Sequence, residues 1–141
     1  MVATPTDTFI EVKDTVKIRC AVSVLFDHFI DPELLKKWWP QSAIIEPRVG
    51  GTIELFWFGG NKLTTFFSIF EKDKMIAYDF YQEKLEVEFI ETGDRSMVTI
   101  SHKLPSASTV NAIVHVAQTW SLLLTNLKSV IQHQTDLREK E

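Results

Sequence analysis

The middle of this 141-residue sequence is a series of short apolar runs separated by turn-forming residues. The runs follow one another too closely for a helix to fit between them, and parallel strands need a crossover of about a dozen residues or more. The series therefore predicts antiparallel strands joined by tight turns. The turn residues are Gly50-Gly51, Gly59-Gly60-Asn61, Asp73-Lys74, Gln82-Glu83 and Gly93-Asp94. The strands between them are expected over residues 52–58, 63–70, 75–81, 85–90 and 96–104.

Alternation within these runs predicts which side chains face the core. Leu85, Val87 and Phe89 alternate with charged residues, so one face of that strand is expected to be buried and the other wet. Residues 63–70 are apolar at both parities. We expect this strand to be covered on both sides or to form the most enclosed part of the sheet.

One strand and two short helices are predicted before this series. Residues 9–20 alternate between apolar and polar side chains, as a half-buried strand does. Residues 22–30 carry apolar side chains at helical spacing. Asp31 and Pro32 begin a second helix, because an aspartate caps free amides and proline fits the first helical position. Pro40 ends it.

A long amphipathic helix is predicted near the C-terminal end of the sequence. Its apolar residues recur at steps of three and four over residues 107–133, and at about 1.5 Å per residue it is roughly 40 Å long. A compact chain of this size has a radius of gyration of only about 14 Å, so the helix must cross the whole molecule. Residues 135–141 alternate charges without an apolar face and are expected to fray, which leaves an ordered core of about residues 9–133.

These elements together predict an α+β fold in which a long helix lies across the concave side of a curved antiparallel sheet. A sheet that wraps a helix without collapsing fully onto it leaves space between the two layers. The sequence has ten Phe, four Trp and two Tyr, which is more large rings than a minimal core needs. The rings are expected to fill this space or to line it.

Three segments, in this order, resemble one known family. They are Asp31-Pro32-Glu33-Leu34-Leu35-Lys36-Lys37-Trp38-Trp39, then Val49-Gly50-Gly51 at the start of a strand, then Trp120, Leu124 and Leu127-Lys128 in the last helix. The family comprises homologues of the activator of heat-shock protein 90 ATPase, within the START-like or SRPBCC superfamily of helix-grip folds. The resemblance implies a single START-like domain over residues 1–141, with about seven strands that grip the C-terminal helix around a hydrophobic cavity.

The leading hypothesis is non-catalytic binding of a small hydrophobic or amphipathic molecule in that cavity. His102 is the expected polar anchor, because it shares the parity of Val98 and Ile100 and should point inward. The predicted ligand-binding residues are Trp57, Phe67, Tyr78, Phe89, His102, Ile113, Ala117 and Trp120. Of Trp38 and Trp39, one is expected to face inward and the other to lie at the cavity mouth or to contact a protein partner.

Two other classes of function stay open. One is a cyclase- or aromatase-like enzyme, as found among relatives of this fold; His102 and an acid such as Asp79 pointing together into the cavity would favour it. The other is a co-chaperone-like module that binds a partner such as a chaperone. An exposed Trp38 or Trp39 would favour such a protein contact. The sequence assigns no catalytic residue and makes no prediction about oligomeric state.

Charge and composition exclude several kinds of partner. The net charge is −4 and no stripe of Lys and Arg is present, so no nucleic acid is expected. No apolar stretch is long enough to cross a membrane and residues 1–8 lack the features of a signal peptide, which predicts a cytoplasmic protein. Cys20, the single cysteine, is expected to be a small buried residue. The four histidines are scattered, so no metal and no cofactor are predicted.

Overall fold

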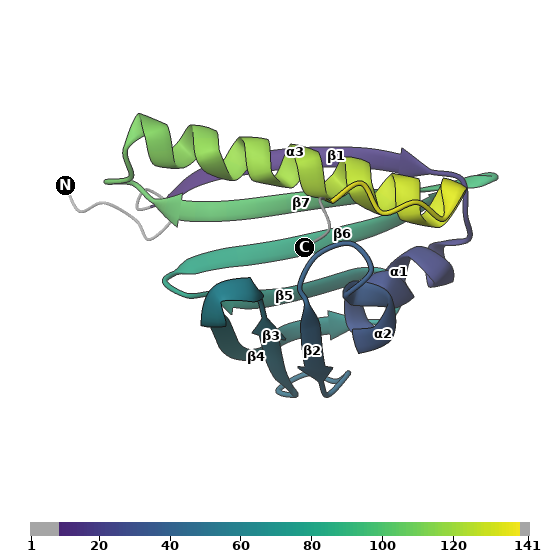
Figure 1. Ribbon diagram of the computed structural model, residues 1–141, viewed down its shortest axis with the longest axis horizontal. Helices are drawn as coiled ribbons and strands as arrows, with labels where there is room; N and C mark the ends of the chain where they lie inside the picture. The colour runs from purple at the N-terminus through teal and green to yellow at the C-terminus, as the bar shows by residue number, and fades with distance from the viewer. Residues whose placement is uncertain (1–8, 139–141) are drawn as a thin grey trace.

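The computed structural model describes residues 9–138, and within this range a seven-stranded sheet and three α-helices form two layers (Figure 1). The strands are β1 (Phe9–Ile18), β2 (Ser42–Ile45), β3 (Thr52–Phe56), β4 (Lys62–Glu71), β5 (Met75–Phe80), β6 (Glu83–Thr92) and β7 (Arg95–Pro105). The helices are α1 (Val22–Ile30), α2 (Pro32–Leu35) and α3 (Val110–His133), and a 3-10 turn, η2, covers Phe58–Gly60. The predicted α+β fold class is confirmed.

All seven strands pair antiparallel, in the order β1-β7-β6-β5-β4-β3-β2. Strands β2 to β7 form a meander in chain order, and β1 pairs with β7 at the other edge of the sheet. Each apolar run in the middle of the sequence is a strand of this meander, with its ends displaced by a residue or two. Strand β2 has no counterpart among those runs. It is a short edge strand on which Ser42 and Ile44 are exposed.

The helices pack on one face of the sheet, and the core lies between the two layers. Helix α3 runs along β1 and β7, as Figure 1 shows. Phe26 and Phe29 of α1 pack edge-on against Phe89 of β6, with ring centroids 5.1 and 5.2 Å apart. Leu85 and Val87 of β6 are buried on the same face as Phe89, as the alternation predicts.

Strand β4 is not covered on both sides, which was the first of the two alternatives predicted for it. Phe67 is buried, but Phe66 is 58% exposed on the outer face of the sheet. Phe70 has the same parity as Phe66 but packs against Phe26 of α1, with ring centroids 5.6 Å apart. A register shift between Phe67 and Ile69 also interrupts the regular alternation.

The helix ends follow local capping chemistry. The Asp31 carboxylate accepts a hydrogen bond from the Glu33 amide at 2.9 Å and begins α2, as predicted. The Thr109 hydroxyl accepts one from the Ala112 amide at 3.1 Å, so α3 begins three residues after the predicted start at 107. No helix within residues 9–138 is both long and apolar enough to cross a membrane.

The turn before β3 explains the paired glycines. Gly50 has a φ of +75°, which L side chains rarely adopt. A Cβ atom on Gly51 would collide with the backbone carbonyl of Glu46, so this position has no room for a side chain. The same turn bonds to β4: the Gly50 amide donates to the Phe67 carbonyl at 2.8 Å and the Phe67 amide to the Gly51 carbonyl at 3.0 Å.

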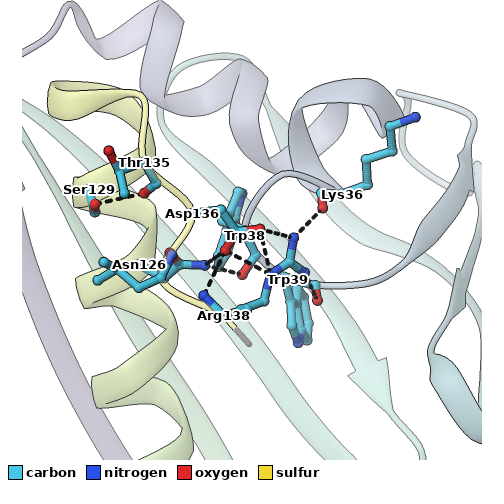
Figure 2. Close-up of polar contacts among 9 residues, drawn as sticks. Lys36, Trp38, Trp39, Asn126, Ser129, Thr135, Asp136 and Arg138 are labelled. Atoms are coloured by element: carbon cyan, nitrogen blue, oxygen red, sulfur yellow. Dashed lines mark hydrogen bonds and ion pairs between the residues drawn. The ribbon is translucent and has the colours of Figure 1, made fainter. Parts of the chain in front are cut away.

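Residues 134–138 form a C-terminal strap that returns from the end of α3 to α2 (Figure 2). The Arg138 guanidinium donates to the carbonyls of Trp39 and Lys36 at 2.9 and 2.8 Å and pairs with the Asp136 carboxylate at 2.7 Å. Asn126 of α3 donates to Asp136 and accepts from the Leu137 amide. Residues 135–138 are therefore held in place, contrary to the expectation of fraying, while 139–141 lie outside the described residues.

Candidate functional site

A cavity of about 300 Å³ lies between the first half of α3 and the sheet, where β5 ends, β6 begins and β7 ends. Helix α3 forms one wall, the three strands form the facing wall, and Trp39, from the segment after α2, adds a third side. The lining is mainly aromatic and aliphatic with a few polar groups. The lining residues are Trp39, Phe80, Glu83, His102, Leu104, Ala112, His115, Val116, Thr119, Trp120 and Leu123.

Trp39 is the centre of the aromatic wall. Its ring stacks on Phe80 with centroids 5.9 Å apart and lies 5.1 Å from Trp120. Trp57 lies behind this wall, in edge contact with Trp39 at 5.9 Å and with Phe80 at 6.1 Å. These offset and edge-to-face arrangements are the favourable ones for aromatic pairs. The wall is therefore held in place by its own packing.

The polar side of the cavity is a chain of three side chains from three elements. The Trp120 indole N–H of α3 donates to Nδ1 of His102 at 2.8 Å. Nε2 of His102, on β7, lies 2.5 Å from Oε1 of Glu83, at the start of β6. Both ring nitrogens of His102 therefore have a hydrogen-bond partner. The side chain is 4% exposed, so these bonds are shielded from bulk solvent.

This hydrogen-bond chain determines the tautomer of His102. A ring nitrogen that accepts a hydrogen bond carries no proton, so Nδ1 is bare and the proton lies on Nε2. Nε2–H then donates to the Glu83 carboxylate. The pair consists of a neutral imidazole and a carboxylate, and the Glu83 side chain, 29% exposed, remains partly open.

Three of the ten predicted binding or mouth residues line this cavity. His102 and Trp120 form its polar chain, and Trp39 forms its aromatic wall. Trp38 is fully buried instead, and its indole N–H donates to the His28 carbonyl at 2.9 Å. Trp57 lies in the layer behind the wall.

The other five predicted residues lie outside the lining for two reasons. Phe67, Tyr78 and Phe89 are in the filled part of the core, nearer α1, and burial raises the pKa of the Tyr78 hydroxyl. Ile113 and Ala117 are half-buried on α3 but do not line the cavity. The cavity lies along the neighbouring flank of the helix, that of Ala112, Val116 and Leu123.

Glu83 is one of the lining residues that sequence reasoning missed, because it was assigned to a turn. It shares the parity of Leu85 and Val87, and Leu85 pairs with His102 across β6 and β7. Extending that parity by one step would have placed the Glu83 carboxylate on the inner face beside His102. Asp79, the acid that was considered, is exposed on the opposite parity of β5.

Other chemistry in the described residues is limited. Among residues 9–138, no group of three or more His, Cys, Asp or Glu side chains is arranged to hold a metal ion. Cys20 is half-buried, and burial raises the pKa of its thiol, which disfavours the reactive thiolate.

Solved structures with the same fold include three that cover most of this chain. A protein from Staphylococcus saprophyticus has a TM-score of 0.85 at 20% identity, with 93% of this chain and 98% of that one covered. The Aha1 dimer from Colwellia psychrerythraea has a TM-score of 0.77 at 17% identity, with 88% and 97% covered. CalU16 from Micromonospora echinospora has a TM-score of 0.75 at 16% identity, with 95% and 81% covered.

The sequence matches no curated protein. A family profile, described as "Activator of Hsp90 ATPase homolog 1-like protein", matches residues 19–132. That match extends from the residue after β1 to the last turn of α3, so it includes six of the seven strands and all of the cavity lining. The chain belongs to this family of activator of Hsp90 ATPase homologue-like proteins.

Proposed function

We propose that this protein binds a small hydrophobic or amphipathic molecule in the cavity between α3 and the sheet, without transforming it. The observation that carries the proposal is a cavity of about 300 Å³ with an aromatic wall and one polar chain. Small-molecule sites are commonly apolar clefts of about 300–1,000 Å³ with few polar groups. The volume is at the lower end of that range, which suits a compact ligand.

Intrinsic tryptophan fluorescence tests this proposal, because Trp39 and Trp120 line the cavity. We expect saturable changes in emission on titration with members of a panel of alkyl alcohols, isoprenoids, flavonoids and fatty acids. Val116→Phe should weaken binding about tenfold or more, because the larger ring occupies the cavity. Val114→Phe is the matched control, since Val114 is on α3 but 45% exposed and outside the lining. The absence of saturable binding by every member of the panel would contradict the proposal.

An acid–base enzyme is the second candidate, because His102 does meet a carboxylate at the cavity. Both His102 ring nitrogens are engaged, however, so His102 has no free nitrogen for a substrate. Glu83 is the one member of the pair with an oxygen left over. This arrangement supports binding more directly than proton transfer, which needs a group free to exchange its proton.

A chaperone-partner function rests on family membership and on the Colwellia structure named as Aha1. The exposed indole that would have favoured a protein contact is absent at Trp38 and Trp39, which are 0% and 8% exposed. An unchanged Hsp90 ATPase rate on addition of this protein would count against a co-chaperone function.

A further inference from the structure

We infer that the cavity selects amphipathic molecules with a cationic head, such as a protonated amine, over neutral and anionic molecules of the same size. This inference rests on the proposed binding function and specifies its ligand class. It depends on the charge state of the Glu83–His102 pair, on the absence of basic side chains in the lining, and on the rings around them.

The first step is that the polar chain leaves a negative charge in the site. Because the Trp120 N–H occupies Nδ1, His102 is neutral in this arrangement and donates a single hydrogen bond to Glu83. A neutral donor stabilises a carboxylate without cancelling its charge. The Glu83 side chain is 29% exposed, so its second oxygen can meet a ligand.

The second step is that no basic side chain of the lining compensates this charge. The cavity lining contains neither Lys nor Arg. The adjacent lysines on these strands have other contacts. Lys103 pairs with Glu86 at 2.6 Å, and the Lys84 ammonium lies over the Phe9 ring, 5.9 Å from its centroid. His115 is the other titratable group in the lining, and it is exposed on α3.

The third step is that aromatic rings line the same cavity as the carboxylate. Trp39, Phe80 and Trp120 line the same cavity as Glu83. Ring faces attract cations, and the attraction strengthens where the cation is partly desolvated. A carboxylate beside aromatic rings therefore favours an ammonium group on an apolar body. A fatty-acid carboxylate would instead meet Glu83, and like charges in a partly dry site repel.

Isothermal titration calorimetry with three ligands of the same chain length tests the inference. The ligands are octylamine, octanol and octanoate, at about pH 8, where the amine is still charged and the fatty acid is ionised. We expect octylamine to bind about tenfold more tightly than octanol, and octanoate to bind most weakly. Glu83→Gln keeps an acceptor for His102 and should bring the ratio of octylamine affinity to octanol affinity close to one.

The matched control is Glu88→Gln, because Glu88 lies on β6 but is exposed on the other face. It should leave the order of the three ligands unchanged. Equal binding of octylamine and octanol, or an amine preference that survives Glu83→Gln, would overturn the inference while leaving ligand binding intact. If no compound in the wider panel binds either, the proposed function itself fails. The comparison in the wild-type protein decides the question even where the variant does not fold.

Discussion

At the scale of single residues, the Trp120 indole determines what His102 can do. A carboxylate neighbour favours the protonated form of a histidine, whereas burial disfavours it. Here the indole N–H, 2.8 Å from Nδ1, occupies the position that the second proton would need. The net charge of the Glu83–His102 pair therefore depends on the Trp120 indole N–H, which is itself neutral.

Replacing Trp120 with Phe should release this restriction. The variant loses the donor to Nδ1, so the ring proton of His102 is no longer confined to Nε2. Leaving a buried acceptor unpaired costs about 1–3 kcal/mol of stability. Nitrogen-15 NMR of the imidazole should show a single Nε2–H form in the wild type and a changed form in the variant.

Trp57→Phe is the control for this experiment, because Trp57 belongs to the same aromatic group but its indole does not bond to His102. Its imidazole spectrum should match that of the wild type. An identical His102 spectrum in all three proteins would show that the indole does not control the tautomer.

At the scale of elements, the C-terminal strap shows how polar contacts organise a segment that hydrophobic patterns describe poorly. The Arg138 guanidinium beside Asp136 lowers the pKa of that carboxyl from 3.8 to about 2. A lowered pKa means that the folded state binds fewer protons than the unfolded state between these two values. The Asp136 contribution to stability is therefore complete above about pH 4 and is lost as the pH falls toward 2.

Asp136→Asn should consequently destabilise the protein at neutral pH and have little effect at about pH 2. The expected loss at pH 7 is about 1 kcal/mol or less, because both members of the pair are about one-third exposed and solvent screens them. Urea unfolding of the two proteins at both pH values measures the difference. Asp94→Asn, in the turn between β6 and β7, is the control. A loss of equal size at both pH values would contradict an ionic origin.

The sequence could predict the elements in which apolar side chains recur at a regular spacing. Strands β3 to β7 were placed because side-chain alternation and turn residues agree there. The strap was not, because the Arg138 hydrogen bonds that hold it to Trp39 and Lys36 join positions far apart in the chain. The inward position of Glu83 was missed because Glu83 is the first residue of β6 and was assigned to the preceding turn.

At the scale of the whole molecule, stability should be unevenly distributed over the sheet. Strand β7 lies between β1 and β6 and is covered by helices, whereas β2 is a four-residue edge strand with one neighbour. Regions with few buried contacts open at a lower free energy than the core. Native-state hydrogen exchange should therefore be slowest at the paired amides of β6 and β7 and fastest, among the strands, in β2. Uniform protection across the sheet would contradict this gradient.

The overall architecture was predictable because element order and short connections leave few topologies, whereas the cavity lining was not. Ile113 and Ala117 have the right spacing for a helix face that meets the sheet, but the cavity lies on the flank beside them. Which flank is open depends on the path of α3 over β1 and β7, and on Trp39 reaching in from a distant segment. Neither is encoded in local periodicity.

The strap also has a mechanical consequence. Arg138 bonds to the carbonyls of Trp39 and Lys36, so tension applied at the C-terminal end of the described chain is carried first by these two hydrogen bonds. Part of the load therefore passes to the segment that holds the Trp39 ring against Phe80, in addition to the last turns of α3, from which the strap continues. A pulling force at that end would therefore deform the cavity wall before it separates the strands of the sheet.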